Sequence, residues 1–243
     1  RIRGWSVYKG FSRAIIPEYQ KSFYHSDNLS EYYFEIPAGA GMVVPLTVIY
    51  RFNGNDNLLN IKVRRTNQTT VATPPSDEPV KIILRPDVES RNHHELTKAF
   101  MGAENSWPSN TKDWDAGFVF HDRDIRLEMI CQNGKFTRED EWYYQIPHPI
   151  EIERGMDGEG DIFSPGYFKI SLKDNEESNL KAWAGKEEEW DNRLTAKKEI
   201  GGDVSAFDAP DSLKQIMKNS IEKFIVKRNN NQTIVAGYPW FLD

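Results

Sequence analysis

Residues 58–65, with the sequence LLNIKVRR, decide the fold class. Apolar side chains alternate with polar ones in this segment, and a period of two is expected for a strand that buries one face. The same alternation recurs at 80–84 and 125–129. Further apolar segments predict strands at 44–52, 117–120, 141–146 and 167–172. Many short strands with no helical pattern between them predict a mainly β fold, a large antiparallel β-sandwich.

Turn-forming residues separate these strands. We expect loops where Gly, Pro and Asn cluster, at 37–45, 53–57, 73–79 and 105–113. The pair Asn133-Gly134 is typical of a type I′ turn, because both central residues of that turn need a positive φ. We therefore expect a hairpin between the 125–131 strand and the strand that contains Phe136.

The pattern changes after Leu172. Residues 174–199 are charged and rich in helix-forming residues, and the acidic run at 187–189 is typical of a solvated helix face. An amphipathic helix is predicted at 213–228 from an apolar stripe at helical spacing, made of Leu213, Ile216, Met217, Ile221, Phe224 and Ile225. The stripe needs a partner, and we expect it to pack on the sandwich or on a second copy of the chain.

Composition limits the partners and the compartment. The 243-residue chain has a formal net charge of -6, so it repels nucleic acid and anionic membranes, and no basic tract is present. No apolar run approaches the ~20 residues that a membrane-spanning helix needs. The first residues lack the apolar segment of a secretory signal, so we expect a cytoplasmic protein. Cys131 is the single cysteine, which excludes an intrachain disulfide and is more typical of a core residue than of a nucleophile.

We expect no metal ion and no cofactor. His93 and His94 have Asp87 and Glu89 nearby, but adjacent residues of a strand point to opposite faces and cannot share an ion. The acidic segment at 157–161 lacks the ligand spacing of a calcium loop.

Three blocks of the sequence resemble segments of one enzyme family. The most specific is FIVKRNNNQTIVAGYPWFLD at 224–243, whose Ala-Gly-Tyr-Pro-Trp-Phe run is similar to the family's junction between a linker helix and a catalytic domain. The second block, at 139–172, contains the matching pair Arg154-Gly155 and the matching run PGYF. The third, at 83–99, contains a proline, an arginine and a histidine in the family's order, Pro86, Arg91 and His94. In these blocks the chain resembles the N-terminal part of bacterial-type glycogen debranching enzymes, the amylo-α-1,6-glucosidases. The first eighty residues contain no such block.

The resemblance implies an architecture. A β-sandwich of the type called a supersandwich would occupy residues 1–185, and a helical linker would occupy 186–231. Residues 232–243 would begin an (α/α)6 glucosidase toroid, the chain's own folding partner. The whole polypeptide would hydrolyse α-1,6 branch linkages of glycogen or limit dextrin by an inverting mechanism with two carboxylates. Both carboxylates lie in the family's toroid, so the chain alone should be inactive.

The resemblance also suggests site residues. Tyr238, Trp240 and Asp243 would contribute to the glucan pocket, as an aromatic wall and a carboxylate that accepts hydroxyl protons. Residues of the junction or of a loop near the toroid mouth would be Arg91, His94, Arg154, Glu159 and Asp161. The chain departs from the family at its acidic pair, because Gly160 separates the two carboxylates.

Two other hypotheses remain open. The chain could be a free glucan-binding module that uses Trp107, Trp114 and Trp142, or the N-terminal domain of another toroid α-glycosidase, such as a glucoamylase-like or trehalase-like enzyme. The helical stripe followed by GYPWFLD favours the debranching enzyme over a free module. We expect weak binding of glucan by the chain, because the strand segments contain no regular row of Trp or Tyr on one face.

Overall fold

A computed structural model describes residues 1–26, 28–53, 56–66, 68–91, 95–190, 213–222, 224–228 and 231–234. The chain divides into two compact units, Arg1–Lys198 and Glu199–Asp243.

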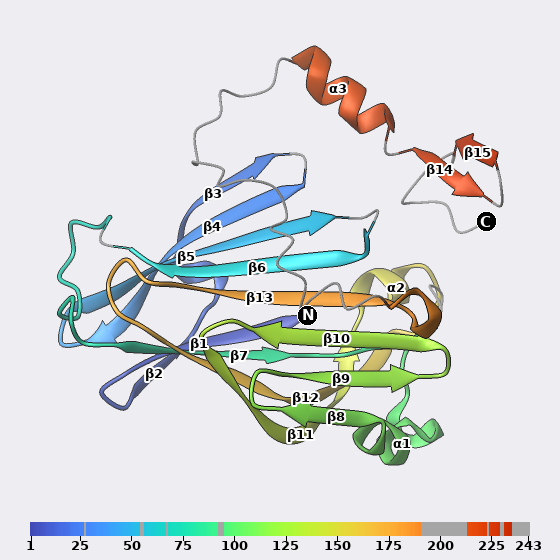
Figure 1. The fold of residues 1–243 in the computed structure, drawn as a ribbon, viewed down its shortest axis with the longest axis horizontal. Helices are drawn as coiled ribbons and strands as arrows, with labels where there is room; N and C mark the ends of the chain where they lie inside the picture. Colours follow the sequence, from blue (N-terminus) through green and yellow to red (C-terminus); the bar gives the residue numbers. More distant parts are fainter. Residues whose placement is uncertain are drawn as a thin grey trace. The chain divides into compact units, whose positions relative to one another are not determined.

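The first unit is a sandwich of two antiparallel sheets, which confirms the predicted fold class (Figure 1). The five-stranded sheet has the order β11 (Gly134–Pro147), β12 (Glu159–Leu172), β7 (Val80–Pro86), β1 (Ile2–Tyr8) and β2 (Phe11–Ala14). The eight-stranded sheet has the order β3 (Gln20–Ser26), β4 (Leu29–Gly39), β5 (Met42–Asn53), β6 (Leu58–Arg65), β13 (Glu177–Lys186), β10 (Ile125–Cys131), β9 (Gly117–Asp122) and β8 (Thr111–Trp114). All the strands predicted from apolar alternation are present.

The alternating apolar residues form the core between the sheets. On β7, Ile82 lies opposite Ile170 of β12 and Leu84 lies opposite Phe168, and all four side chains are buried. Burial of each such side chain stabilises the fold by about 1.5–3 kcal/mol. The period of two therefore identified both the strands and their buried faces.

Short helices interrupt the strands, and one of them corrects a loop prediction. The helix α1 (Ala103–Ser109) lies partly in the 105–113 segment, where Gly, Pro and Asn predicted a loop. Its Trp107 side chain is only 4% exposed, so packing against the core outweighs the weak local helix propensity. The other short elements are η1 (Pro17–Tyr19), η3 (Ala99–Met101), α2 (Pro149–Glu153) and η4 (Glu187–Glu189).

The predicted hairpin at Asn133-Gly134 is wrong. Strand β10 pairs with β9 and β13, whereas β11 pairs with β12 in the other sheet, so the turn carries the chain from one sheet to the other. Asn133 has a φ of 59°, but Gly134 is not among the residues with positive φ. Gly134 is needed for space, because a Cβ there would lie 2.5 Å from the Cys131 Sγ atom and 3.2 Å from Ile170. The turn signal is local, whereas pairing depends on strands distant in sequence.

The helix-forming composition after Leu172 does not correspond to an α-helix in residues 174–190. Residues 177–186 form β13, which lies between β6 and β10 in the larger sheet, and the acidic run that follows is the 3-10 turn η4. Leu180 is fully buried and Trp183 is 1% exposed. Burial of these two side chains favours the strand over the helix that the charged residues suggest.

The second unit contains α3 (Leu213–Glu222), β14 (Ile225–Arg228) and β15 (Asn231–Ile234). The helix predicted at 213–228 is therefore correct as far as Glu222 and wrong at 225–228, where β14 pairs with β15. Ile225 and Val226 are β-branched, which favours a strand once a pairing partner exists. Two stripe residues, Met217 and Ile221, are 56% and 62% exposed, so the packing of the stripe stays a prediction. In the described segments, no helix combines the length and the hydrophobicity of a membrane span.

The close approach at Gly134 can be tested by substitution. Gly134→Ala should lower the free energy of unfolding by about 1–3 kcal/mol, because the new methyl group overpacks the core against Cys131 and Ile170. Urea unfolding followed by circular dichroism would measure the change. In a double-mutant cycle, Cys131→Ala should remove part of the loss because it vacates the space of the sulfur atom. A Gly134→Ala protein as stable as the parent chain would refute the claim that the turn between the two sheets needs a glycine at position 134 for space.

Candidate functional site

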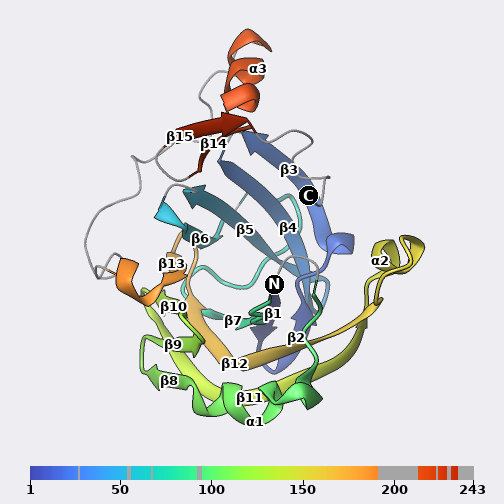
Figure 2. The same cartoon turned by 90° about the vertical axis from the view of Figure 1, so that its right-hand side faces the viewer.

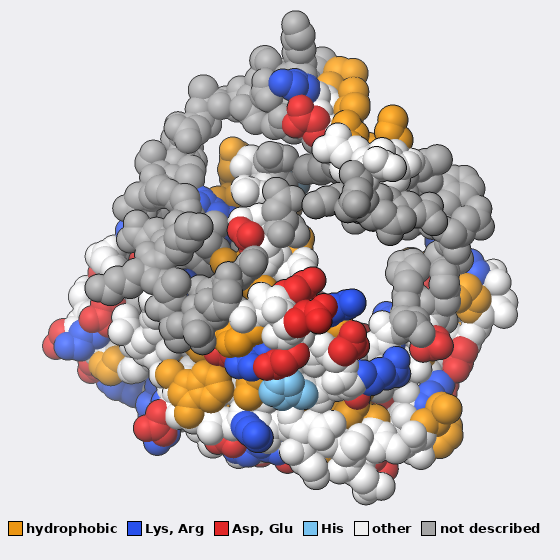
Figure 3. Space-filling view, turned by 45° about the vertical axis from the view of Figure 1, so that its right-hand side comes forward, with side chains coloured by type: hydrophobic (Ala, Val, Ile, Leu, Met, Phe, Trp, Pro, Cys, Tyr) orange, Lys and Arg blue, Asp and Glu red, His pale blue; other side chains and the backbone are white. Residues whose placement is uncertain are grey.

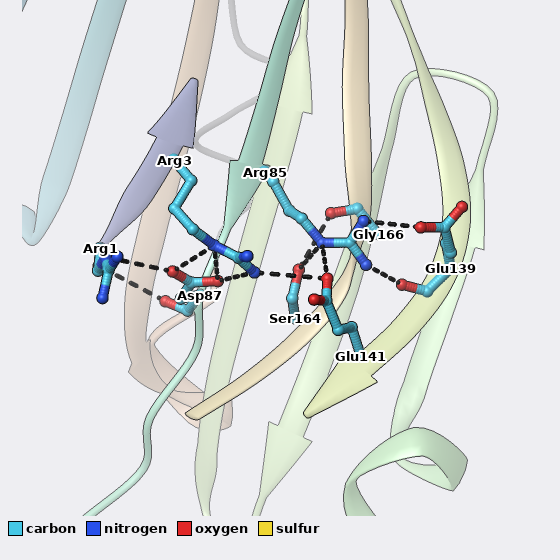
Figure 4. Close-up of polar contacts among 8 residues, drawn as sticks. All are labelled: Arg1, Arg3, Arg85, Asp87, Glu139, Glu141, Ser164 and Gly166. Atoms are coloured by element: carbon cyan, nitrogen blue, oxygen red, sulfur yellow. Dashed lines mark hydrogen bonds and ion pairs between the residues drawn. The ribbon is translucent and has the colours of Figure 1, made fainter. Parts of the chain in front are cut away.

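A network of charged side chains joins strands β1, β7, β11 and β12 of the five-stranded sheet (Figure 4). Arg3 of β1 lies opposite Arg85 of β7, and Asp87 directly follows β7. Glu139 and Glu141 come from β11, at the edge of the sheet. The network therefore joins segments separated by up to 138 positions, from Arg3 to Glu141.

Each guanidinium group of the network is paired. The Arg85 side chain is 8% exposed, its Nη1 atom donates to Glu139 Oε1 at 2.8 Å, and its Nε atom lies 2.7 Å from Glu141 Oε2. Arg85 Nε also donates to the Ser164 hydroxyl at 3.0 Å. Arg3 donates from Nη2 to Asp87 Oδ1 at 2.8 Å and lies 3.6 Å from Glu141. Glu141 thus connects the two arginines.

The pairing of these side chains indicates a structural role. The carboxylates of Asp87, Glu139 and Glu141 form hydrogen bonds or ion pairs with arginines, so each is held in place on the sheet. We interpret the network as a clamp that joins β1, β7, β11 and β12.

The predicted loop residues at and before the start of β12 have separate partners. Asp161 is buried, and its two carboxylate oxygens accept hydrogen bonds from the backbone N–H of Ala99 at 2.8 Å and of Gln145 at 2.9 Å. Glu159 is exposed, and Arg154 lies 3.8 Å from Glu151 on α2. Asp161 is therefore a structural acceptor that ties η3 to β11.

The same loop holds an ion pair at the surface. Lys98 lies 2.8 Å from Asp157, and its Nζ atom also donates to the Glu159 carbonyl. The hydrogen bond from Lys98 is the largest effect that lowers the pKa of Asp157 below its usual value. These contacts fix the loop between α2 and β12 to the segment that precedes η3.

The remaining predicted site residues divide into two groups. Arg91 donates from Nη1 to the Glu95 carbonyl at 2.7 Å and from Nε to Glu89 Oε1 at 3.2 Å, so it binds its own loop. Four predicted residues lie outside the described residues, namely His94, Tyr238, Trp240 and Asp243.

The three tryptophans proposed for a glucan-binding module do not form a platform. Trp107 is 4% exposed and stacks on Trp142 with ring centroids 5.4 Å apart. Trp142 also packs on Phe163 at 5.3 Å and is half-buried against the core. Trp114, at the end of β8, is 40% exposed. Trp107 is thus part of the core, and the interpretation of Trp107 as a glucan-binding residue is wrong.

A different set of rings lies on one face of the larger sheet. The aromatic face, as we call it, consists of Phe23 and His25 on β3, Ser30 and Tyr32 on β4, and Tyr50 and Phe52 on β5. Phe23 lies opposite Tyr32, and Ser30 lies opposite both His25 and Tyr50. The sequence showed no row because each strand supplies only one or two of the rings. Weak glucan binding was expected because no single strand carries a row of rings, and that reasoning did not include a surface formed across strands. The expectation of weak binding stays untested.

The other candidate groups are the Cys131 thiol, side chains that could bind a metal ion, and charged side chains at the surface. Cys131 is 4% exposed, and burial raises the pKa of its thiol to about 11, so the thiol is protonated near neutral pH. The described part of the chain contains no group of three or more His, Cys, Asp or Glu side chains arranged to hold a metal ion. On the face shown in Figure 3, the described acidic and basic side chains are intermixed, so they form no single-sign patch for a charged ligand there.

Comparison with known proteins identifies the family. The model of the family described as "Glycogen debranching enzyme N terminal" matches residues 17–179, more than half of the chain. The chain belongs to this family. The blocks at 83–99 and 139–172 lie inside the match, and 224–243 lies beyond it. The match also includes most of the first eighty residues, where no family block was recognised in the sequence.

Two solved structures that resemble the chain do so at a low level. A putative kojibiose phosphorylase from the human microbiome is 12% identical with a TM-score of 0.40, and the match covers 90% of this chain and 26% of that protein. The heparan sulfate lyase HepC from Pedobacter heparinus is 10% identical with a TM-score of 0.38, covering 69% of this chain and 21% of the lyase. This chain thus spans about a quarter or less of either protein. No curated protein matches the chain.

The structural role of Asp161 predicts that its substitution lowers the free energy of unfolding more than substitution of Glu159 does. Asp161→Asn should lower the free energy of unfolding by about 1–3 kcal/mol, because the amide group offers one acceptor oxygen to two backbone donors. Glu159→Gln, two residues away and exposed, should change it by less than about 0.5 kcal/mol. Thermal unfolding of both variants would measure the difference. Equal effects would contradict the assignment of Asp161 as a buried acceptor.

Proposed function

We propose that this chain is the non-catalytic N-terminal sandwich of an amylo-α-1,6-glucosidase that hydrolyses branch linkages of glycogen or limit dextrin. The observation that carries the proposal is the family match over residues 17–179 together with the sandwich that those residues form. In this proposal the α-glucan is bound by the whole polypeptide, which acts in the cytoplasm.

The chemistry of the reaction supports a non-catalytic role for the sandwich. Inverting hydrolysis needs an acid and a base about 6.5–9.5 Å apart, with room for a water molecule between the base and the sugar. The buried carboxylates Asp87 and Glu128 are each paired with an arginine, and the buried Asp161 accepts hydrogen bonds from backbone N–H groups. In the proposal, the acid and the base belong to a toroid domain of the whole polypeptide.

The proposal retains the domain boundaries suggested by the sequence. In the proposal, residues 1–185 are the sandwich, 186–231 are a linker that contains α3 and β14, and 232–243 begin the toroid, with Tyr238, Trp240 and Asp243 in the glucan pocket. The loops that contain Arg91, His94 and Arg154 would then lie at the junction with the toroid. The ion pair between Lys98 and Asp157 supports this because it holds one such loop in place.

Two alternatives have different support. A glucoamylase-like or trehalase-like toroid enzyme would use the same sandwich, and the catalytic residues of the whole polypeptide would distinguish it. A glucan-binding module is favoured by one observation, the aromatic face on β3, β4 and β5. Binding of glucan by the sandwich is compatible with the debranching enzyme.

The proposal predicts a division of activity. The 243-residue chain should release no glucose from isomaltose or limit dextrin above the buffer background, because the sandwich supplies no acid–base pair. The whole polypeptide encoded by the same gene should release glucose from limit dextrin. A coupled glucose assay of both proteins, with equal molar amounts, measures this. Failure of the whole polypeptide to release glucose, or release by the 243-residue chain alone, would overturn the proposal.

A further inference from the structure

The aromatic face lies on a part of the larger sheet that the smaller sheet leaves uncovered. Strands β3, β4 and β5 extend away from the five-stranded sheet (Figure 2). The smaller sheet contacts β4 at its far end, where Phe11 of β2 would lie 3.6 Å from a Cβ at Gly39. Tyr32 is seven residues from Gly39 on the same strand, about 23 Å at ~3.3 Å per residue. Tyr32 and Tyr50 pack against the core, and Phe23 and Phe52 extend the same face of the sheet into an exposed region.

Four of the rings are in contact with one another, namely those of Phe23, His25, Tyr32 and Tyr50. The centroids of Phe23 and Tyr32 are 4.8 Å apart, and those of Tyr32 and Tyr50 are 5.8 Å apart. Phe23 also stacks on His25 at 6.3 Å with nearly parallel planes. Phe23 and Phe52 are each 52% exposed. A cluster of exposed rings costs free energy in water, which indicates a surface that binds a ligand.

The polar groups of the face suit an uncharged ligand. None of its six side chains is a carboxylate, an ammonium or a guanidinium group, so an ionic ligand would find no charge partner among them. His25 Nδ1 is hydrogen-bonded to the Ser30 hydroxyl at 2.9 Å, which orients the ring and leaves Nε2 available. Within the described residues, the Tyr32 and Tyr50 hydroxyls have no hydrogen-bond partner, and burial raises the pKa of Tyr50, so its hydroxyl remains a donor.

Rings next to hydroxyl and imidazole groups match a sugar, which has an apolar face of C–H groups and an edge of hydroxyl groups. The C–H groups of a pyranose ring pack on an aromatic face, while its hydroxyl groups need donors and acceptors beside that face. Apolar side chains of another protein would cover the rings but would offer no partner to the hydroxyls of Tyr32 and Tyr50, whereas each pyranose carries several hydroxyl groups that can pair with them. The combination therefore favours a neutral polyhydroxylated ligand over an apolar protein surface.

We propose that the aromatic face binds α-glucan chains, with Phe23, Tyr32 and Phe52 as stacking residues and His25 as a hydrogen-bonding residue. The choice of α-linked glucose rests on the proposed function, and the choice of a neutral sugar rests on the face itself. The sandwich then holds the polysaccharide as well as supporting the toroid.

Isothermal titration calorimetry of the 243-residue chain with maltoheptaose tests this proposal. We expect a dissociation constant below about 1 mM, weakened about tenfold in Phe23→Ala, the change that corresponds to loss of one aromatic contact of about 1.4 kcal/mol. Tyr24→Ala is the matched control, because Tyr24 is the next residue on β3, is 45% exposed and points to the opposite face. Its affinity should equal that of the parent chain. Phe52→Ala on β5 is a second test, with circular dichroism confirming the fold of each variant.

Other outcomes overturn the proposal in distinguishable ways. No binding of maltoheptaose, or binding that Phe23→Ala and Phe52→Ala leave unchanged, removes the site while leaving glucose release by the whole polypeptide untouched. Phe23-dependent binding of cellohexaose in place of maltoheptaose shows a sugar site for β-linked chains, and it contradicts the substrate class of the proposed function as well. A dimer in sedimentation velocity that Phe23→Ala dissociates shows that a second copy of the chain occupies the face.

Discussion

The sandwich depends on the burial of one guanidinium group, that of Arg65 at the end of β6. The residue is 0% exposed, and its Nη1 atom donates to the Glu78 carbonyl at 2.7 Å and to the Leu172 carbonyl at 3.4 Å. Its Nη2 atom donates to the carbonyls of Pro74 at 2.6 Å and Pro75 at 3.1 Å. Burial lowers the pKa of Arg65, so the carbonyl oxygens must compensate for the water that the charge has lost. One side chain thus ties the larger sheet to the end of β12 and to the segment that leads into β7.

Local periodicity predicted the strands, and it also indicated that Arg65 would lie on the buried face. In LLNIKVRR, Arg65 has the same phase as Ile61 and Val63, so the alternation places it on the buried face. Long-range pairing could not be predicted in the same way. The turn at Asn133 connects two sheets because β9 and β13 already pair with β10. Residues 177–186 form a strand despite their helix-forming composition, because β6 and β10 pair with them on the two sides.

The functional residues were harder to predict because they come from several strands. Asp161 was identified from a family block, but its role follows only from its bonds to Ala99 and Gln145, which are distant in sequence. The aromatic face is invisible along the chain, whereas Trp107 is conspicuous there and proves to be in the core. Ring type and spacing along one strand therefore say little about a sugar-binding surface that forms across strands.

Unfolding of an Arg65→Ala variant tests most directly whether this buried charge holds the two sheets together. Urea unfolding of the 243-residue chain should show a loss of at least about 3 kcal/mol, because four carbonyl contacts and the packed side chain are lost together. Native-state hydrogen exchange should then become faster in both β6 and β12. Arg64→Ala is the control, since Arg64 is exposed on the opposite face of the same strand. An Arg65→Ala protein as stable as the Arg64→Ala control, or faster exchange in β6 alone, would contradict the account.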